Sequence, residues 1–290
     1  MDNLRAALLM TAAMALFAVE DSFLKTLTGR LPAGQVLMMT GIMASGLFWA
    51  LIAAQGGRLW TRDLLHPAVM LRNLGEGLAG ILFLSALTYG DLATASAILQ
   101  ALPLALTLGA VLFLREKVGW RRWSSIIVGL IGVLIVVRPG TEAFHPSAAL
   151  AVGAVVALTL RDLATRRIPP GVSSQVLTAS AFASLIPGGL ILLLFGNRPM
   201  LLPVAGELMI LSGAVAFGLV AYMAMVGAMR LGEIAVIAPF RYTRLVFALI
   251  LAVLVFGERP DTATLTGAAI IALAGMAAMW REARLARRGR

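Results

Sequence analysis

Apolar stretches long enough to cross a membrane follow one another along almost the whole chain, separated by short polar or Gly- and Pro-containing connections. A helix that crosses the ~30 Å hydrocarbon core of a bilayer needs about 20 apolar residues. The stretches do not alternate in polarity, so they indicate helices and not the short strands of a barrel. Ten spans are predicted: Leu4 to Leu24, Leu31 to Ala54, Ala68 to Leu87, Leu92 to Leu114, Trp123 to Val137, Ala148 to Leu163, Val176 to Phe195, Ala205 to Met229, Ile234 to Phe256 and Leu265 to Trp280.

One part of this pattern occurs twice, about half the chain apart. Residues 87–117 match residues 229–259 at a constant offset of 142. Self-similarity at a fixed offset indicates an internal duplication. We therefore expect two units, residues 1–140 and residues 141–290, with five spans in each.

Because five is an odd number, the second unit enters the membrane from the side opposite to the first. The predicted fold class is therefore an all-α polytopic membrane protein with ten transmembrane helices in two inverted five-helix repeats. Inverted repeats recur in secondary transporters, whose substrate site lies near the bilayer midplane between the halves.

Composition agrees with a membrane protein. Hydrophobic residues make up 60% of the chain and charged residues 13%, and the mean hydropathy is +0.92. A soluble protein of this size carries roughly 25% charged residues, so these values exclude that class.

The basic residues predict the orientation in the membrane. Sixteen of the 24 Lys and Arg residues fall in the termini and in connections on the same side as the N-terminus, whereas five fall on the other side. Since Lys and Arg accumulate in cytoplasmic loops, both termini are expected in the cytoplasm. The net charge of +10 is spread over loops that flank the membrane. Membrane lipid, and not nucleic acid, is therefore the expected partner of these charges.

Residues for catalysis or metal binding are scarce. The chain has no cysteine, and its two histidines, His66 and His145, fall in connections on opposite sides of the predicted membrane. No cofactor, no metal site and no ATP-binding loop is predicted. An intramembrane enzyme is the alternative of a different class. Thr88, however, stands where the Gly-x-Gly-Asp pattern of intramembrane proteases needs its first glycine.

Polar residues inside the spans are the candidates for substrate binding, because ionisable groups are costly in a bilayer. At ~1.5 Å per residue, Glu76 in the third span and Arg244 in the ninth both come near the midplane. Pro103 and Pro239 are predicted hinges that free backbone groups for a cavity. The candidate residues are Arg72, Asn73, Glu76, Gln100, Arg241, Tyr242 and Arg244.

Each of these groups also has a structural interpretation. Glu76 paired with Arg241 or Arg244 would be a salt bridge that only joins helices. Arg72 lies one to two turns inside the boundary, where its side chain could reach the membrane surface. Glu20 is a candidate for proton coupling or for an ion pair.

Two i,i+4 pairs predict ion pairs at helix ends. Asp21 precedes Lys25 by four residues, and Asp162 precedes Arg166 by four residues at the corresponding place in the second half. Residues at this spacing face each other on a helix. Asp21, like Glu20, is also a candidate for proton coupling.

Tryptophan marks one side of the predicted membrane. All five tryptophans, Trp49, Trp60, Trp120, Trp123 and Trp280, fall toward the cytoplasmic ends of their spans. This placement predicts an aromatic belt at that interface.

The duplicated pattern resembles the EamA module of the drug/metabolite transporter superfamily. Gly90 and Asp91 begin a span, Pro103 lies within it, Glu116 follows its end, and Gly132 lies in the next span. The second copy repeats the pattern at Gly232, Glu233, Gly257, Glu258, Gly267 and Gly275. The resemblance implies ten helices in two inverted halves, in the bacterial inner membrane. It also implies a secondary carrier that moves a small metabolite by alternating access, for which one monomer suffices.

Within the superfamily the chain is similar to the YddG-type group of aromatic amino acid exporters. In that interpretation, Arg241 or Arg244 would bind the carboxylate of a zwitterion. Glu76, Gln100 or Glu20 would bind its ammonium group, and Tyr242 with the apolar walls its side chain.

Two other substrates stay open. The same groups would serve an S-adenosylmethionine uptake permease, which residues 239–244 also resemble. Export of a cationic drug would depend on Glu20, Asp21 and Glu76 instead.

Overall fold

The protein is described by a computed structural model that covers residues 2–57, 62–115, 119–169, 172–196, 198–231 and 237–288. All regular structure in these ranges is helical. The elements are α1 (Asp2–Thr28), α2 (Ala33–Ala54), η1 (Arg62–Leu65), α3 (Pro67–Tyr89), α4 (Leu92–Leu99), α5 (Leu102–Leu114), α6 (Trp120–Val137), α7 (Pro146–Thr165), α8 (Ser174–Phe195), α9 (Ala205–Leu231), η2 (Ala238–Tyr242), α11 (Thr243–Phe256) and α12 (Thr262–Arg288).

Helix lengths confirm a ten-span membrane protein. In the described chain, nine spans are long and apolar enough to cross a membrane, and a shorter apolar helix, Trp123–Val137, lies within α6. The fourth span, Leu92–Leu114, combines α4 and α5.

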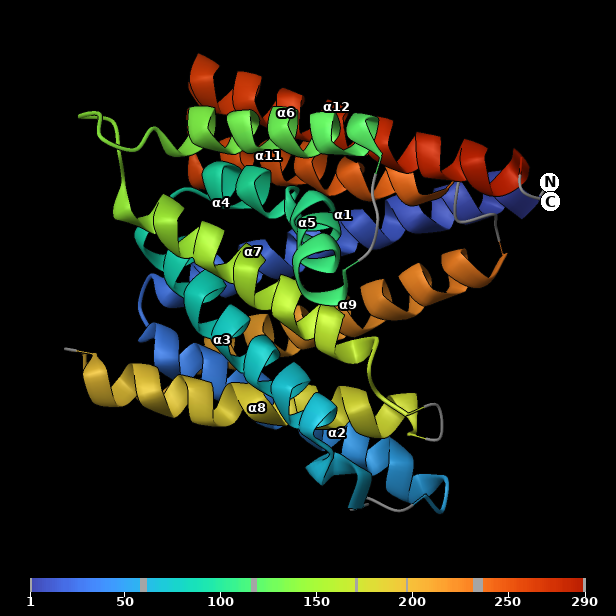
Figure 1. Cartoon of the computed structure of the whole chain (residues 1–290). Coiled ribbons are helices and arrows are strands. Elements are labelled where there is room, and N and C mark those ends of the chain that lie inside the picture. Colours follow the sequence, from blue (N-terminus) through green and yellow to red (C-terminus); the bar gives the residue numbers. More distant parts are fainter. Residues whose placement is uncertain are drawn as a thin grey trace.

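The two halves of the chain interlock helix by helix. The main packed pairs are α1 with α9, α3 with α7, α2 with α8, and α6 with α12, so each pair takes one helix from each half (Figure 1). Helix α1 starts at the end of the molecule where both termini lie, the terminal end, whereas α7 starts at the opposite end (Figure 1). This arrangement confirms two inverted repeats.

Two spans are broken at the prolines where the sequence predicts a hinge, Pro103 and Pro239. Helix α4 ends at Leu99, and α5 starts at Leu102 with Pro103 in its first turn. Pro239 lies in the short helix η2, which precedes α11. Proline lacks the backbone N–H that a continuous helix needs, which favours a break at these two places. Proline does not break every span, since α8 continues through Pro187. The first residues expected in the ninth span, and Glu116 in the first repeat, lie outside the described residues.

Glycines allow the paired helices to approach closely. A Cβ atom at Gly34 of α2 would lie 2.5 Å from the carbonyl oxygen of Gly189 on α8. One at Gly132 of α6 would lie 3.0 Å from the carbonyl oxygen of Gly267 on α12. A Cβ at Gly75 of α3 would lie 2.9 Å from a backbone nitrogen of α7. Small residues at such crossings are the usual way in which helices pack in a membrane.

Ion pairs join separate segments of the chain at the end of the molecule opposite the two termini. Lys25 Nζ lies 2.7 Å from Glu258 Oε1. The Glu258 carboxylate also accepts the backbone N–H groups of Leu92, at 2.8 Å, and Ala93, at 3.0 Å. It therefore satisfies the otherwise free amides at the start of α4, where a negative charge is favourable.

Asp261 forms a second junction at this end. The backbone N–H of Thr264 donates to its Oδ1 at 2.8 Å, and Arg138 Nη2 lies 2.6 Å from its Oδ2. These two partners hold the pKa of Asp261 below its ordinary value.

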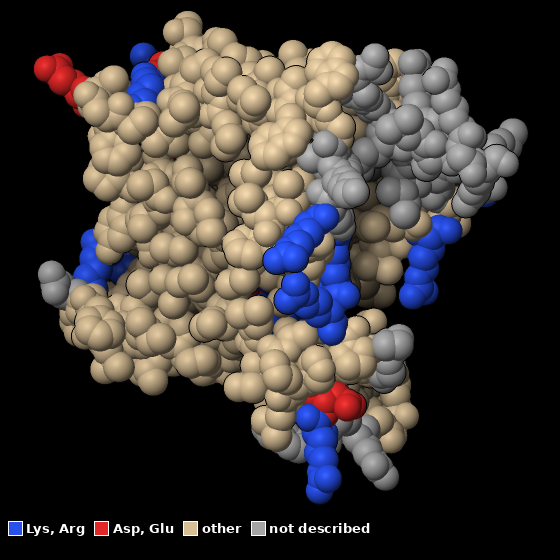
Figure 2. All heavy atoms as spheres, in the orientation of Figure 1, with Lys and Arg blue, Asp and Glu red and all other residues tan. Residues whose placement is uncertain are grey.

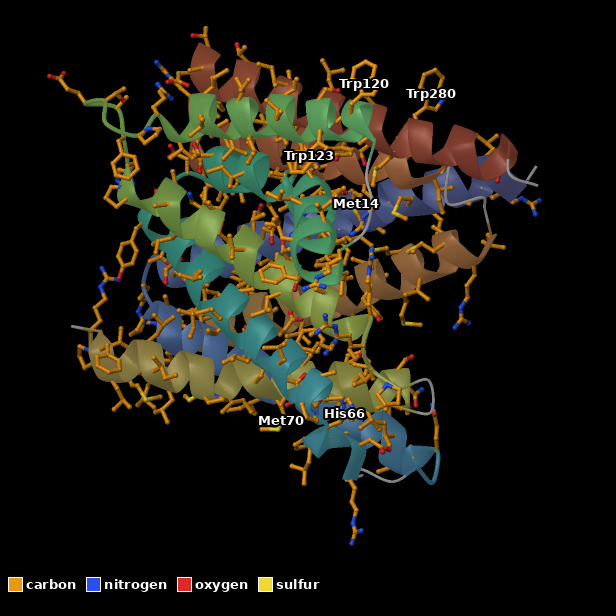
Figure 3. The ribbon with its side chains drawn as sticks, in the orientation of Figure 1. Met14, His66, Met70, Trp120, Trp123 and Trp280 are labelled. Carbon is orange, nitrogen blue, oxygen red and sulfur yellow. The ribbon has the colours of Figure 1, made fainter. Side chains whose placement is uncertain are left out.

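Charge and aromatic residues follow the membrane pattern. On the face seen in Figure 2, the charged side chains lie in a few separate groups, and the broad area between the left edge and the middle of the view is almost free of them. Trp120, Trp123 and Trp280 lie in the half of the molecule nearer the terminal end (Figure 3). Trp60 of the predicted belt lies outside the described residues.

Candidate functional site

Helices α1 and α11 are joined by a buried ion pair. Asp21 is 3% exposed, and its Oδ2 lies 2.7 Å from Arg244 Nη2 and 3.2 Å from Nε. The guanidinium also stacks on Phe17, 5.2 Å from the ring centroid. The expected partner of Asp21, Lys25, pairs instead with Glu258 at the opposite end, so that prediction is wrong. Because α11 lies beside α1, Arg244 of α11 comes closer to Asp21 than Lys25 does, although Lys25 is on the same helix as Asp21.

A second charge cluster joins α3 and α7. Glu76 Oε2 lies 3.2 Å from Arg161 Nη1, and Arg161 Nε lies 2.7 Å from Asp162 Oδ1. The predicted partner of Glu76 was Arg241 or Arg244, and the predicted partner of Asp162 was Arg166. In the structure Arg161 contacts both carboxylates: it reaches Glu76 because α7 packs closely on α3, and it reaches Asp162 as the adjacent residue of α7.

Arg161 is absent from the candidates that the sequence suggests. Its place near the end of a span groups it with the cytoplasmic loop, and only the packing of α7 on α3 shows where its side chain lies. Its position next to Asp162, the counterpart of Asp21, is the one signal in the sequence that could have identified it.

Gln100 and Arg241 come together at the two helix breaks. Gln100 Nε2 donates to the backbone carbonyl oxygen of Arg241 at 3.4 Å. The Arg241 guanidinium is half-buried and has no hydrogen bond or ion pair to the rest of the described chain. Asp162 acts on it through space. Arg241 therefore remains available for an anion.

Tyr242 lies on the other side of η2. It is 6% exposed and packs against Gly275 of α12, and its hydroxyl has no partner within the part of the chain that the structure describes. The ring therefore does not line the pocket described next.

Arg72 and Asn73 connect α3 to α8. Arg72 Nη1 donates to the carbonyl oxygen of Leu177 at 3.0 Å, and Ser180 Oγ donates to Asn73 Oδ1 at 3.4 Å. These contacts bring neither residue into the pocket.

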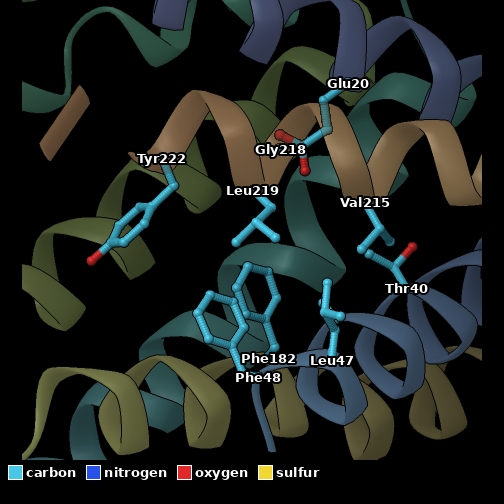
Figure 4. Close-up of a pocket in the computed structure, with 10 residues that line it drawn as sticks. Glu20, Thr40, Leu47, Phe48, Phe182, Val215, Gly218, Leu219 and Tyr222 are labelled. Carbon is cyan, nitrogen blue, oxygen red and sulfur yellow. The ribbon is translucent and has the colours of Figure 1, made fainter. Parts of the chain in front are cut away.

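A narrow pocket opens between α1, α2, α8 and α9 (Figure 4). Its cavity volume is about 20 Å³, close to the space that one water molecule needs, so the pocket is narrow. A larger group enters only if the surrounding helices move apart. Its lining residues are Glu20, Thr40, Ala44, Leu47, Phe48, Phe182, Val215, Gly218, Leu219 and Tyr222.

A carboxylate and an aromatic pair define the chemistry of this pocket. The rings of Phe48 and Phe182 are stacked, with centroids 5.8 Å apart and an interplanar angle of 15°. Glu20 faces the pocket from α1 (Figure 4), and no described residue forms an ion pair or hydrogen bond with its carboxylate. A carboxylate attracts a cation, and aromatic rings can bind a cation or a flat ring. The aromatic residues carry no signal in the sequence, because they read as ordinary apolar positions of a span.

The charged residues of these central helices balance one another. The set contains four acidic and four basic side chains, namely Glu20, Asp21, Arg72, Glu76, Arg161, Asp162, Arg241 and Arg244. Two of these ionisable side chains, Glu20 and Arg241, have no hydrogen-bond or ion-pair partner within the described ranges.

The comparison with known families gives a match over both halves of the chain. The sequence profile of the EamA-like transporter family matches residues 4–138 and, again, residues 145–280.

Individual relatives are transporters for different compounds. An S-adenosylmethionine uptake transporter of Rickettsia felis is 30% identical over 196 residues, which are 68% of this chain and 66% of that protein. A riboflavin transporter of Vibrio cholerae is 29% identical over 178 residues, 61% of this chain and 59% of that protein. The matched stretches thus span slightly less than two thirds of these relatives. A solved structure, described as the crystal structure of a protein, shares the fold at a TM-score of 0.64 and 20% identity, covering 96% of this chain and 98% of that one.

Proposed function

Because the chain belongs to the EamA-like transporter family, we propose that it is a secondary carrier for an amino-acid-type metabolite with an additional cationic group. Membrane transport itself follows from the family and its relatives. S-adenosylmethionine is the first candidate, moved across the bacterial inner membrane by alternating access.

The pocket at Glu20 carries this proposal. S-adenosylmethionine combines a positively charged sulfonium, an amino acid group and a flat adenine ring. The unpartnered carboxylate of Glu20 supports recognition of a cation, and the stack of Phe48 and Phe182 supports recognition of the ring. A relative that is 30% identical is an S-adenosylmethionine uptake transporter, which favours the same compound.

Arg241 is the proposed partner of the substrate carboxylate. Its guanidinium is free of direct partners in the described chain, whereas Arg244 is held by Asp21. Guanidinium groups bind carboxylates through strong charge-assisted hydrogen bonds.

Export of aromatic or neutral amino acids is the second candidate. The stacked rings of Phe48 and Phe182, together with Tyr222 across the pocket, also suit an aromatic side chain (Figure 4). The two candidates differ in charge. S-adenosylmethionine carries a sulfonium as well as an ammonium group, whereas a neutral amino acid carries only the ammonium group.

Counterflow in proteoliposomes tests the proposal. Vesicles loaded with unlabelled S-adenosylmethionine are expected to take up trace labelled S-adenosylmethionine in a saturable way, and external tryptophan is expected to compete weakly. The control is Glu207→Gln, which changes a carboxylate on α9 that pairs with Arg30 at the opposite end.

The substrate pattern decides between the candidates. Counterflow of tryptophan without counterflow of S-adenosylmethionine would support the amino acid exporter. No counterflow of either compound, with protein correctly inserted, would overturn the proposal.

A further inference from the structure

The two repeats place Glu20 and Glu76 in related contacts. The offset of 142 residues that aligns the repeats continues upstream into α3 and α9, where it puts Glu76 opposite Gly218. In α1 and α7 the offset is 141, as the match of Asp21 with Asp162 shows, and it puts Glu20 opposite Arg161.

The structure shows the same contact in both halves. On one side, Arg161 of α7 lies 3.2 Å from Glu76 of α3. On the other side, a Cβ atom at Gly218 of α9 would lie 2.5 Å from Oε1 of Glu20 on α1. The first contact is a complete ion pair, whereas the second sets a carboxylate against a residue without a side chain.

The neighbouring acids show what Glu20 lacks. Asp21 pairs with Arg244, and Glu76 pairs with Arg161, but no cation of the described chain forms an ion pair or hydrogen bond with Glu20, on which Arg244 acts only from a distance. An unpaired charge within a membrane-spanning helix is costly, and such residues are usually functional. Because residue 218 is glycine, the Glu20 carboxylate lies directly against α9, with Oε1 2.5 Å and Oε2 2.8 Å from where a Cβ would be, and both residues line the pocket.

We propose that the substrate supplies the missing half of this ion pair: a sulfonium or ammonium group of the substrate binds the Glu20 carboxylate in the pocket that Glu20 and Gly218 line. Phe48, Phe182 and Tyr222 form the apolar and aromatic wall beside this cation (Figure 4). The inference rests on the proposed transport function and adds to it the group that the site selects and the residue that selects it.

An internal cation should replace the substrate. Gly218→Arg puts a guanidinium next to Glu20, so it creates the counterpart of the pair between Glu76 and Arg161. This variant is expected to lose cation binding. Because a Cβ at residue 218 would push the Glu20 carboxylate aside, thermal unfolding checks that the variant is folded. Glu20→Gln keeps the shape of the side chain and removes its charge, so it tests the same site without a change in packing.

Binding to the purified full-length protein is measured with two probes, S-adenosylmethionine and phenyltrimethylammonium, a small aromatic cation without a carboxylate. Both are expected to bind the wild type. Glu20→Gln is expected to lower the affinity for both probes by about tenfold to a hundredfold, the range of a lost charged contact. Gly218→Arg is expected to abolish binding, and Glu207→Gln on the same helix as Gly218 is expected to bind like the wild type.

The two probes separate this inference from the proposed function. Transport of S-adenosylmethionine that is unchanged in Glu20→Gln would overturn the inference and leave the function in place. Binding of phenyltrimethylammonium that depends on Glu20, without any transport of S-adenosylmethionine, would support the inference and overturn that substrate. Wild-type affinity of a correctly folded Gly218→Arg variant would also overturn the inference.

Discussion

Among single residues, Arg244 distinguishes a charge that holds the fold from a charge that binds substrate. Its guanidinium is engaged by buried Asp21 and by the ring of Phe17. Arg244→Ala would leave the carboxylate buried without its partner, which costs about 3–5 kcal/mol. We expect a clear fall in the thermal unfolding temperature in detergent and a loss of counterflow.

The paired substitution Asp21→Asn with Arg244→Gln is the matched control. It removes both charges together, so no unpaired charge remains, and most of the lost stability should return. Because we assign the substrate carboxylate to Arg241, counterflow should return as well. A stable double variant without counterflow would instead make Arg244 a substrate contact.

The partners of the charged residues could not be predicted from the sequence. The presence of charges in the membrane could be read from the spans, but their partners could not. Asp21 is four residues from Lys25 in the chain and yet bonds Arg244, which is more than 200 residues away. Such pairing depends on which helices face each other, and a span's apolar pattern does not record its neighbours.

Among the helices, the close crossing of α2 with α8 predicts that a side chain at residue 34 lowers the stability of the protein. A Cβ at Gly34 would meet backbone atoms of α8, 2.5 Å from the oxygen of Gly189 and 2.7 Å from the nitrogen of Leu193. Since backbone cannot move aside as a side chain can, Gly34→Ala should cost about 1–3 kcal/mol. Thermal unfolding of the purified protein measures the effect.

Gly46 supplies the control within the same helix. Apart from its own chain neighbours and the backbone of its own helix, no atom lies within 4 Å of a Cβ built there. Alanine is the better helix former by up to about 1 kcal/mol, so Gly46→Ala should leave the unfolding temperature unchanged or raise it. Equal losses in the two variants would show that the crossing does not set the stability.

Helix breaks were predictable because their cause is local. Pro103 and Pro239 remove a backbone donor at their own positions, so the sequence indicated where both breaks lie, although Pro187 shows that a span can also continue through proline. The cap at the start of α4 was not predictable. Glu258 reaches its amides from a segment more than 160 residues away, and only the inverted packing of the halves brings the two together.

The orientation of the whole molecule in the membrane is the prediction on which the direction of transport depends. Both termini lie at one end (Figure 1), and sixteen of the 24 basic residues are predicted on that side. Since Lys and Arg are retained in the cytoplasm during insertion, the terminal end should be cytoplasmic. Alkaline phosphatase fused to the C-terminus should therefore be inactive, and a fluorescent protein fused there should be bright.

A fusion in the turn between α6 and α7 tests the orientation of the opposite end of the same chain. Phosphatase inserted at residues 141–143, at the end far from the termini, should be active because that end faces the periplasm. The reverse pattern in both fusions would invert the molecule. The ion pair of Lys25 with Glu258 would then join the helices on the cytoplasmic side. Substrate would reach the pocket at Glu20 from the other compartment. Uptake and export are thus distinguished only once this orientation is measured together with the direction of net flux.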